Sequence, residues 1–501
     1  MPRYVEDPRK INQRALDLCE KLLSQEKALT PKERLAIPQQ KPPVLDPLER
    51  SRWQDEVEKT YLPAQAILEA SRCLNCKVPQ CVKGCPVAID IPGFMKATAE
   101  GDFAQAVAII KRTSLLPAIC GRVCPQERQC MQNCTVGKGL KDVQSSVAIG
   151  KVERFLADWD REQADSAAPE VAPPTGKKVA VVGSGPAGLV VAADCRRAGH
   201  EVTVFEALHK LGGVLRYGIP EFRLPKKVID AEIATLKRMG VKFHTNFLVG
   251  RTRQLSELLE EDGYSAVFLG VGAGLPIFMG IPGEDLVGVS TANEYLTRAN
   301  LMGAIQPGHN DTPTYNSKKV IVLGGGNVAM DACRMAMRLG AEEVTVLYRR
   351  SRAEMPARAE EVQHALEEGI RINFLENAVA IHGDDKGRVT SVTVQRYELG
   401  EPDASGRRRP VAIEGDTYEL EADTVLVAIG NLSNPLLTAA TPGLEVNKRG
   451  NIIVDEATGK TSLDRVYAGG DIVLGAATVI LAMGEGRRAA AAINELLAAE
   501  K

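Results

Sequence analysis

Two copies of a glycine-rich pattern constrain most strongly what this chain of 501 residues can fold into. The first copy, "KKVAVVGSGPAGLVVAADCRRAGHEVTVFEA", starts at residue 177, and the second, "KKVIVLGGGNVAMDACRMAMRLGAEEVTVLYRR", starts at residue 318. In each copy a Val- and Ile-rich segment leads into a glycine turn, a helical pattern and a second apolar segment, which is the order of a parallel βαβ unit. The sequence therefore predicts an α/β protein with two Rossmann-like dinucleotide-binding domains.

The first copy has all the features of a dinucleotide site. Gly183 allows a tight turn, Gly185 lets the backbone approach a pyrophosphate, and Gly188 lets the helix pack closely on the strand. The pyrophosphate would lie at the N-terminus of the helix, where unpaired N–H groups are available. Glu206 ends the second strand and is placed to accept a hydrogen bond from a ribose hydroxyl. The alternative is a tight glycine turn that binds no ligand. Such a turn would not need an acid such as Glu206 at the end of the second strand.

The segment "TSLDRVYAGGDIVLGAATVILAMGEGRRAA" indicates which dinucleotide binds there. It resembles the second FAD motif of flavoproteins with two dinucleotide-binding domains, in which an Asp after a strand holds the ribityl chain and the next helix begins at the flavin. Asp471 matches that Asp. The resemblance implies FAD, and the FAD-binding residues that we expect are Gly183, Gly185, Pro186, Ala187, Gly188, Glu206, Gly213, Arg216, Gly470, Asp471 and Thr478.

The second copy differs at the position that distinguishes the two nicotinamide cofactors. Where the first copy ends in Glu206, the second ends in Tyr348, Arg349 and Arg350, so no carboxylate is available for a ribose 2′-hydroxyl. Paired guanidinium groups can instead bind a 2′-phosphate, which favours NADPH over NADH. The alternative is two solvated arginines at a strand end. The NADPH-binding residues that we expect are Gly324, Gly326, Asn327, Val328, Arg349, Arg350 and Gly430.

Two cysteine runs precede these domains. The first, "SRCLNCKVPQCVKGCPVAIDIPGF", contains Cys73, Cys76, Cys81 and Cys85, and the second, "CGRVCPQERQCMQNC", contains Cys120, Cys124, Cys130 and Cys134. Zinc takes four ligands, usually as two pairs, whereas each run holds four thiols and the first ends in Cys-Pro, as cluster-binding runs often do. The spacing C-x2-C-x4-C-x3-C-P departs from the bacterial ferredoxin run. We expect two [4Fe–4S] clusters, with zinc or a purely structural role as alternatives.

The overall charge excludes some functions. The chain has 62 basic and 64 acidic residues, a net charge of -2, and therefore no basic footprint for nucleic acid. The N-terminal "MPRYVEDPRKINQ" lacks the basic and apolar regions of a signal peptide, and no apolar run approaches the roughly 20 residues of a membrane span. We expect a cytoplasmic protein, where thiols stay reduced and dense cysteines indicate a metal or redox site.

Composition also predicts the domain boundaries. A helical pattern followed by the Pro-rich "IPQQKPPVLDP" indicates an arm, and both cysteine runs lie among helical patterns that indicate a small α-helical domain. A stretch rich in Ala, Pro and charge then reads as a linker. We expect an arm at 1–50, an α-helical iron–sulfur domain at 51–160, a linker at 161–177, FAD-binding parts at 178–300 and 426–501, and an NADPH-binding domain at 301–425.

The chain from about Arg72 to Ala492 resembles the small (β) subunit of NADPH-dependent glutamate synthase and its relatives. These relatives include the N-terminal half of dihydropyrimidine dehydrogenase and the FAD/NADP subunit of the electron-bifurcating NADH-dependent ferredoxin:NADP oxidoreductase. The resemblance rests on "CLNCKVPQCVKGCPV", "CGRVCPQERQC", "GSGPAGL", "GGVLRYGIPEFRLPK", "GGGNVAMD", "RRSRAEMPA" and "AGGDIVLGAATVI".

The resemblance implies an NADPH-dependent oxidoreductase in which a hydride passes from NADPH to FAD, with no catalytic side chain, and single electrons then pass through the clusters, or the reverse. The partner would be a larger subunit, either the glutamate synthase large chain or a bifurcating, ferredoxin-dependent partner, with ferredoxin as a further candidate. An FAD/NADP(H) subunit of a bifurcating transhydrogenase or hydrogenase is the alternative. A regulatory or scaffolding nucleotide-binding module with structural clusters is an alternative of another class.

The resemblance also implies a division of the cluster ligands. In dihydropyrimidine dehydrogenase the two runs share clusters, and one iron takes a glutamine from an "IGGLQQF"-like helix, which "IGKVERF" matches here with Glu153. Carried over by position, one cluster takes Cys73, Cys76, Cys81 and Cys134, and the other takes Cys85, Cys124, Cys130 and Glu153. Cys120 would then be uncoordinated. In the alternative, Cys120 is the eighth ligand and Glu153 is a solvated helix residue.

Overall fold

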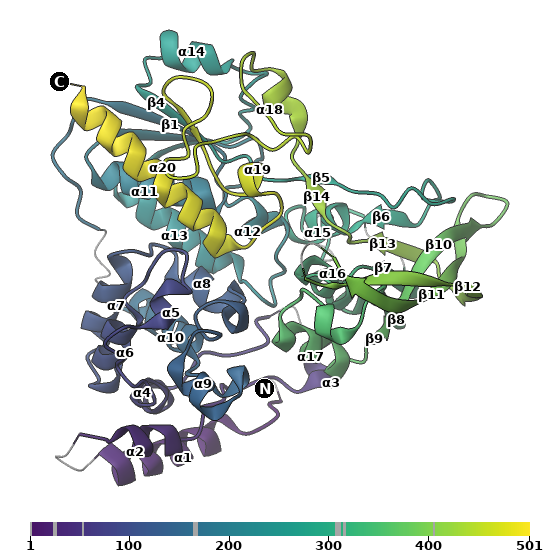
Figure 1. Cartoon of the computed structure of the whole chain (residues 1–501), viewed down its shortest axis with the longest axis horizontal. Coiled ribbons are helices and arrows are strands. Elements are labelled where there is room, and N and C mark those ends of the chain that lie inside the picture. The colour runs from purple at the N-terminus through teal and green to yellow at the C-terminus, as the bar shows by residue number, and fades with distance from the viewer. Residues whose placement is uncertain are drawn as a thin grey trace.

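The structure is a computed structural model of the chain and describes residues 3–23, 28–52, 55–163, 169–305, 312–313, 317–403 and 406–500. Figure 1 shows three bodies: a helical body from the N-terminal part of the chain, an α/β body that carries the C-terminal helix, and a second α/β body beside them. We call them the cluster domain, the first nucleotide domain and the second nucleotide domain. The predicted fold class is confirmed by the two parallel sheets and the helical domain before them.

The N-terminal arm contains short helices with well-defined starts. Thr30 caps α2 by accepting a hydrogen bond from Glu33 N, and Asp46 caps α3 by accepting one from Leu48 N, with Pro in the first turn of both helices. Between these helices an extended segment pairs Val44 with Glu58. The helices of the arm are α1 (Pro8–Leu23), α2 (Pro31–Ala36) and α3 (Pro47–Arg50).

The cluster domain is built from short helices that surround the cysteines. Asp90 and Asp102 cap two of the helices, and Phe94, Ile119 and Leu156 are fully buried. Its core is continuous with that of the first nucleotide domain, so the two domains bury a common apolar surface. Its helices are α4 (Pro63–Ser71), α5 (Gln80–Lys83), α6 (Ile91–Ala99), α7 (Phe103–Lys111), α8 (Pro117–Val123), η1 (Gln126–Arg128), α9 (Thr135–Leu140), η2 (Val143–Ser145) and α10 (Ile149–Glu162).

The first nucleotide domain has a parallel sheet in the order β15-β4-β1-β2-β3. Its strands are β1 (Lys178–Val182), β2 (Glu201–Phe205), β3 (Lys242–His244), β4 (Ala266–Leu269) and β15 (Val466–Ala468). Its helices are α11 (Pro186–Arg197), α12 (Val214–Tyr217), α13 (Lys226–Arg238), α14 (Leu255–Glu260), α18 (Pro435–Ala439), α19 (Asp471–Leu474) and α20 (Val479–Ala499). The long α20 packs along α11, which follows the first glycine turn.

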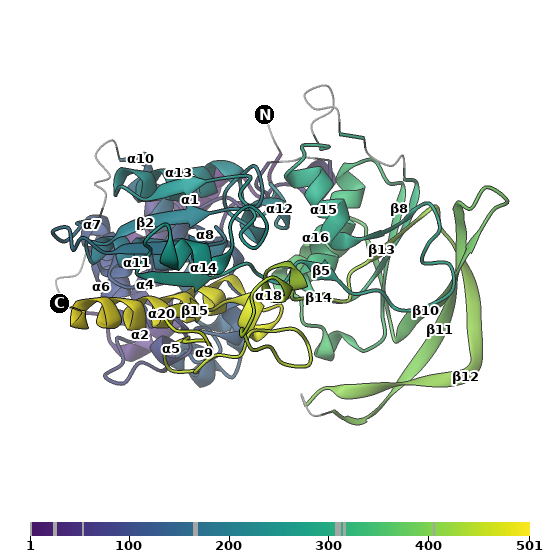
Figure 2. The same cartoon turned by 90° about the horizontal axis from the view of Figure 1, so that it is seen from above.

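The second nucleotide domain has a parallel sheet in the order β6-β13-β7-β8-β9. Its strands are β6 (Val289–Thr291), β7 (Lys319–Leu323), β8 (Glu343–Tyr348), β9 (Arg371–Phe374) and β13 (Thr424–Val427), and its helices are α15 (Ala292–Asn300), α16 (Asn327–Arg338), η3 (Arg352–Glu354) and α17 (Ala359–Glu367). An antiparallel sheet of β10 (Glu376–Gly383), β11 (Val389–Pro402) and β12 (Arg408–Glu421) projects from it, as Figure 2 shows.

The chain crosses between the nucleotide domains at positions that differ from the expected boundaries at 300 and 425. The crossing segments are β5 (Leu275–Pro276) and β14 (Asn431–Leu432), which pair antiparallel. Because β6 pairs with β13, residues 289–300 belong to the second nucleotide domain. The expected first FAD part is therefore too long by about one strand and one helix. The strand is short and carries no glycine turn, which is why the sequence pattern did not reveal it.

Buried ion pairs join the bodies. Arg223 of the first nucleotide domain donates to Asp331 of the second, with 2.7 Å to each carboxylate oxygen. Arg50 of the arm is fully buried and lies 3.2 Å from Glu368 of the second nucleotide domain. These pairs satisfy charges that are buried where the second nucleotide domain meets its neighbours, and a shifted arrangement of the domains would leave such charges buried without partners.

Candidate functional site

The first glycine turn has the expected geometry. Gly183 has a φ of +101°, and a Cβ there would lie 2.4 Å from the carbonyl oxygen of Gly270. A Cβ at Gly188 would lie 2.0 Å from the carbonyl oxygen of Gly183. Around Gly185 nothing lies within 4 Å of the added atom, so the backbone is open there. Gly185 is also the N-cap of α11, followed by Pro186 and Ala187, so the open side faces the helix N-terminus that a pyrophosphate would occupy.

Glu206 lies at the end of the strand beside this turn, as expected. Its side chain is buried, and it accepts hydrogen bonds from Ser184 N at 3.0 Å and from Leu208 N at 2.9 Å. The Ser184 hydroxyl accepts a further bond from Gly212 N at 2.9 Å. The Ser184 hydroxyl also donates to the same carboxylate oxygen as Ser184 N, so the other oxygen, which accepts only from Leu208 N, keeps lone-pair capacity for a ribose hydroxyl.

Asp471 and Thr478 lie where the end of the chain returns to the first sheet. Asp471 is the first residue of α19, and burial raises its pKa to about 6. Thr478 caps α20 by accepting from Leu481 N. A Cβ at Gly470 would lie 3.1 Å from the Cβ of Ala187, so the second FAD motif packs directly on the first glycine turn. The structure thus brings the two predicted FAD segments together.

The intervening segment adds a residue that sequence reasoning missed. Burial, with Asp471 and Glu206 nearby, raises the pKa of Tyr217 to about 12, so this phenol is buried within electrostatic reach of both acids of the site. Gly213 caps the helix that carries Tyr217, with a φ of +53°. Arg216 on the same helix donates to Leu211 O at 2.7 Å and pairs with Asp230. Arg216 therefore holds the loop that follows Glu206, and a direct contact with a cofactor stays a prediction.

The second glycine turn repeats this geometry. Gly324 has a φ of +136°, a Cβ there would lie 2.3 Å from the carbonyl oxygen of Ala428, and the position of Gly326 is open. Asn327 begins α16, and its side-chain oxygen accepts from Arg358 N at 2.9 Å. Val328 is partly exposed in the first turn. Gly430 follows two residues after Ala428, at the start of the crossing segment, where its carbonyl accepts from Ile277 N at 3.1 Å.

The two arginines at the end of β8 are not equivalent. Arg349 is exposed. Arg350 is buried and is already bound to the projecting sheet, because it donates to Arg408 O at 2.9 Å and to Asp403 at 3.0 Å. Only Arg349 is therefore available without rearrangement for an approaching 2′-phosphate. The sequence did not distinguish them, since the partner of Arg350 lies more than fifty residues further along the chain.

The cysteines gather into two groups that each draw on both runs. The first group lines one cavity and consists of Cys73, Cys76, Cys81 and Cys134. Burial and the neighbouring thiols Cys134 and Cys76 raise the pKa of Cys73 to about 11, and burial with Cys134 and Cys73 raises that of Cys81 to about 12. Without a metal, thiols this close together stay protonated. A bound cation or cluster would stabilise them as thiolates. This group is partly exposed, and Cys76 donates to Thr135 Oγ1 at 3.3 Å.

The second group is deeper. Burial, with Glu153 and Cys124 nearby, raises the pKa of Cys85 to about 11, and burial with Cys124, Cys85 and Glu153 nearby raises that of Cys130. Burial raises the pKa of Glu153 to about 8, and its Oε1 is buried without a hydrogen-bond partner. Cys120 lies beside Cys124 and donates to the sulfur of Met483 at 3.4 Å.

These observations fit the predicted ligand division without deciding it. In the described parts of the chain, no three or more His, Cys, Asp and Glu side chains form a group that could hold a metal ion as they stand. Glu153 Oε1 is buried beside Cys85 and has no hydrogen-bond partner. A ligand oxygen would be left in this way when the metal that it binds is absent. Because Cys120 lies beside the same group, the choice between Cys120 and Glu153 stays a prediction.

Residues just before Cys130 of the second group contact both nucleotide domains. On one side, Gln129 donates to Thr478 at 3.5 Å, at the start of α20. On the other side, Arg128 donates to Met355 O at 2.6 Å, in the segment that follows β8. The loop that carries Cys130 is thus fixed between the two predicted dinucleotide sites.

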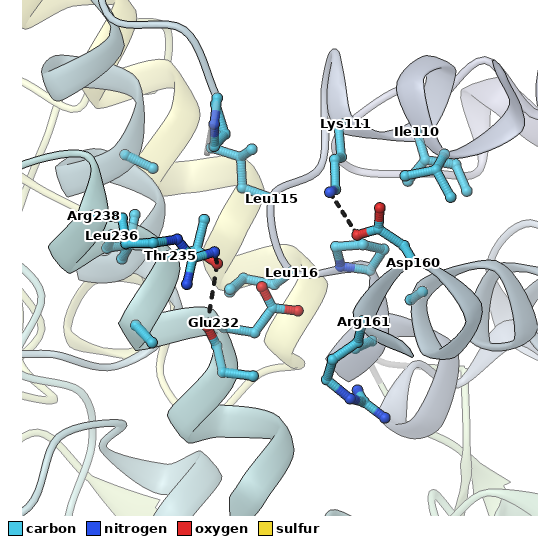
Figure 3. Close-up of a pocket in the computed structure, with 18 of the residues that line it drawn as sticks. Ile110, Lys111, Leu115, Leu116, Asp160, Arg161, Glu232, Thr235, Leu236 and Arg238 are labelled. Atoms are coloured by element: carbon cyan, nitrogen blue, oxygen red, sulfur yellow. Dashed lines mark hydrogen bonds and ion pairs between the residues drawn. The ribbon is translucent and has the colours of Figure 1, made fainter. Parts of the chain in front are cut away.

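A separate cavity of about 530 Å³ lies between the cluster domain and the first nucleotide domain, as shown in Figure 3. Lys111 donates to Asp160 at 2.6 Å at its side, and burial raises the pKa of Glu232 in its wall to about 7. None of the predicted dinucleotide or cluster residues lines it. We therefore assign it no part in the site.

Comparison with known proteins shows which families the chain matches. Residues 50–165 match the family model of dihydropyrimidine dehydrogenase domain II, 4Fe-4S cluster, and residues 149–273 and 177–494 match that of pyridine nucleotide-disulphide oxidoreductase. The chain is 38% identical over 452 residues to the glutamate synthase [NADPH] small chain of Halomonas elongata, covering 89% of this chain and 94% of that protein. It is 40% identical over 440 residues to the NADP(+)-dependent formate dehydrogenase subunit beta of Moorella thermoacetica. This match covers 83% of this chain and 60% of that protein.

Among solved structures, the chain is similar to FprA of Mycobacterium tuberculosis in complex with NADPH. The TM-score is 0.54 at 21% identity, and the match covers 66% of this chain and 86% of that one. At this identity the likeness shows the fold of the nucleotide domains and nothing more. None of the helices in the described parts of the chain has the length and apolar character needed to cross a membrane.

Proposed function

The chain belongs to the family of the NADPH-dependent glutamate synthase small chain, and on that basis we propose that it is the electron-input subunit of a larger oxidoreductase. The observation that carries this proposal is the position of the residues beside the second cysteine group: Cys120, next to Cys124, contacts Met483 of α20, and Gln129, next to Cys130, contacts Thr478. Cluster ligands therefore lie beside the helix that begins at the predicted flavin site.

The first nucleotide domain has the groups to hold FAD. The open N-terminus of α11 would take the pyrophosphate, Glu206 a ribose hydroxyl, and Asp471 the ribityl chain. A bound flavin supplies the exchange between two-electron hydride chemistry and single-electron transfer. The protein itself positions and shields the reacting groups, and it needs no side-chain acid or base for a hydride step.

The second nucleotide domain would hold NADPH at α16. Asn327, fixed by Arg358 N, lies at the helix N-terminus, and the exposed Arg349 lies at the end of β8. A guanidinium group binds a phosphate through two parallel hydrogen bonds. We therefore expect Arg349 to provide most of the selectivity for the 2′-phosphate, with Arg350 holding the projecting sheet in place.

Replacing Arg349 by alanine is expected to weaken NADPH binding by about 1.5–3 kcal/mol, the value of a hydrogen bond to a charged group. NADH binding should stay unchanged, because NADH has no 2′-phosphate. Equilibrium binding of the two nucleotides to the oxidised protein measures this difference. The control is Arg371→Ala, since Arg371 is an exposed arginine of the neighbouring strand that pairs with Glu343. Equal losses for the two nucleotides in Arg349→Ala would remove the assignment.

The two cysteine groups would hold two [4Fe–4S] clusters. The ligands would be Cys73, Cys76, Cys81 and Cys134 for one cluster and Cys85, Cys124, Cys130 and Glu153 for the other. Glu153 is favoured over Cys120 because Cys120 already has Met483 as a partner, whereas a Glu153 oxygen has none. The second group lies beside α20 and the first is partly exposed, which orders them as entry and exit of the electron path.

The partner is a larger subunit. Relatives named glutamate synthase small chain, formate dehydrogenase subunit beta and NADPH-Fe(3+) oxidoreductase subunit beta are parts of larger assemblies by their names. We favour the glutamate synthase type, with a bifurcating, ferredoxin-dependent complex as the second candidate, and a cytoplasmic location. A scaffolding module with structural clusters would show no NADPH-dependent reduction of an added acceptor, which separates it from both.

Two measurements test the proposed function. The first is the iron and flavin content of the protein, expected at about eight irons and one flavin per chain. The second is anaerobic reduction of the uncharged acceptor menadione by NADPH, which the scaffolding alternative does not allow. Copurification of the untagged protein with its neighbouring subunit then identifies the acceptor.

A further inference from the structure

We propose that the surface around Cys76 docks the acidic face of an electron-accepting protein. The surface, called here the exit surface, consists of Lys77, Val78, Lys83, Lys138, Leu140 and Lys141. The inference rests on the proposed function and adds to it the place and the chemistry of the docking. Three of these residues, Lys83, Lys138 and Leu140, lie on α5 and α9, which are near each other in Figure 1 and Figure 2.

The two segments that form the exit surface contain no carboxylate. Although 64 of the 501 residues are acidic, none lies in residues 71–89 or in residues 128–141. Both segments carry cations instead, and Gly84 lies directly against Gln129 and Asn133, which brings the segments together. The surface is therefore positive in a chain whose overall charge is slightly negative.

The lysines of the exit surface are available to a partner. Lys77, Lys83, Lys138 and Lys141 are exposed, and within the described parts of the chain none of them has an ion-pair partner. Other surface lysines do form such pairs, for example Lys318 with Glu342 at 2.7 Å. An unpaired lysine keeps its full charge for a partner at low ionic strength.

Neighbouring elements bring a few acids to the edge of this surface, and each is held by local backbone groups. Glu33 accepts from Thr30 N at 2.7 Å, Asp90 accepts from Gly93 N at 3.0 Å, and Asp142 accepts from Gln144 N at 3.0 Å. From the same elements, Lys32 is exposed and Arg34 donates to Cys73 O at 3.0 Å. The cations around Cys76 therefore outnumber the acids.

The exit surface also has an apolar centre. Val78 is 64% exposed and follows Lys77 directly, and Leu140 is 43% exposed at the end of α9. Protein interfaces combine an apolar centre with a charged rim that steers approach and fixes orientation. Since Val78 lies two residues from Cys76, a partner seated there would approach this partly exposed thiol.

The lysines have a second possible role, which is to compensate the negative charge of a bound cluster. Their exposure argues against a large effect of this kind, because water screens a charge at the surface strongly. Long-range attraction of a partner depends on the same exposed charges and increases association rates by on the order of tenfold or more. The docking role is therefore the one that these positions serve.

The test uses the whole protein with its cofactors and plastocyanin, an acidic one-electron acceptor protein. One NADPH delivers two electrons, so two oxidised plastocyanins become reduced while NADP⁺ and one proton are released. We expect kcat/KM for plastocyanin to fall on the order of tenfold as salt rises from low to physiological concentration. We expect a similar fall at low salt for the double variant Lys77→Glu/Lys138→Glu.

Three controls separate docking from other effects. Reduction of menadione and the iron content of the double variant should match the parent, because neither depends on the exit surface. Lys448→Glu, an exposed lysine of the first nucleotide domain, should leave plastocyanin reduction unchanged. The basic protein cytochrome c should be reduced more slowly by the parent than by the double variant.

The proposal is overturned if the double variant reduces plastocyanin as fast as the parent, or if Lys448→Glu slows the reaction equally. Loss of iron in the double variant would also overturn it, because the lysines would then support the cluster site. A parent that does not reduce menadione with NADPH would contradict the proposed function itself, which makes the two failures distinguishable.

Discussion

Replacing Arg334 by alanine is expected to lower the free energy of unfolding by about 3–5 kcal/mol, the range for breaking a buried ion pair by removing one partner. Arg334 is 1% exposed, lies in α16 and donates to Glu368 at 2.8 Å and to Glu361. Its guanidinium also lies 4.6 Å from the ring centre of Phe222, which belongs to the first nucleotide domain. The alanine variant leaves two buried carboxylates without this partner.

The pH dependence of that loss follows from the same contacts. Burial alone would raise the pKa of Glu361, but Arg223 and Arg334 hold it at about 2, and Arg334 and Arg338 likewise lower that of Glu368. A carboxyl with a lowered pKa stabilises the fold above its unfolded pKa of about 4.3 and loses this contribution as the pH falls toward 2. The deficit of Arg334→Ala should therefore shrink between about pH 4.5 and 2.

Urea unfolding of parent and variant, followed by far-UV circular dichroism, measures the difference. Arg253→Ala is the matched control, because Arg253 also pairs with several acids, Glu257 at 3.2 Å and Asp262 at 2.8 Å among them, but at the surface. Exposed pairs contribute little, so this variant should unfold almost as the parent does. A loss in Arg334→Ala no greater than in Arg253→Ala would show that these buried pairs stabilise the fold no more than surface pairs do.

Replacing Glu153 by alanine is expected to change or remove one cluster and to lower the iron content from about eight toward about four atoms per chain. Replacing Cys120 by alanine should leave about eight irons, because the proposed ligand set does not include Cys120, whose thiol donates to the sulfur of Met483. The physical reason is the unpartnered, buried oxygen of Glu153 beside Cys85. Iron analysis and low-temperature electron paramagnetic resonance of each variant measure both effects.

Two further variants sharpen this comparison. Glu153→Gln keeps an oxygen ligand and should retain the iron with an altered resonance spectrum, whereas Glu162→Ala, an exposed acid of the same helix, should match the parent. Loss of a cluster in Cys120→Ala together with an unchanged Glu153→Ala would reverse the assignment and make Cys120 the eighth ligand.

The sequence predicted most of what depends on local pattern. The glycine turns at Gly183 and Gly324 require special backbone geometry, so glycine spacing identified both turns and the helices after them. The grouping of cysteines across the two runs had a different source. It came from the family resemblance, because spacing along the chain does not say which thiols lie close together in the fold. The structure brings Cys134 to Cys73 and Cys81, in agreement with that grouping.

What the sequence did not predict depends on contacts between distant segments. Arg350 and Asp403 lie far apart along the chain, and no periodic pattern indicates that a buried pair would take Arg350 away from the nucleotide site. The partners of Arg334 and the proximity of Tyr217 to Asp471 and Glu206 are of the same kind. The sequence does not indicate which charged residues are buried or which partners they have, because most charged residues lie at the surface.

The central claim is that electrons from NADPH reach the clusters through this chain, and an anaerobic NADPH titration followed by visible absorbance and electron paramagnetic resonance tests it most directly. NADPH is expected to bleach the flavin and to produce the resonance of reduced iron–sulfur clusters, whereas NADH at the same concentration should do so poorly. Bleaching of the flavin without any cluster signal, or equal responses to NADH and NADPH, would contradict the account.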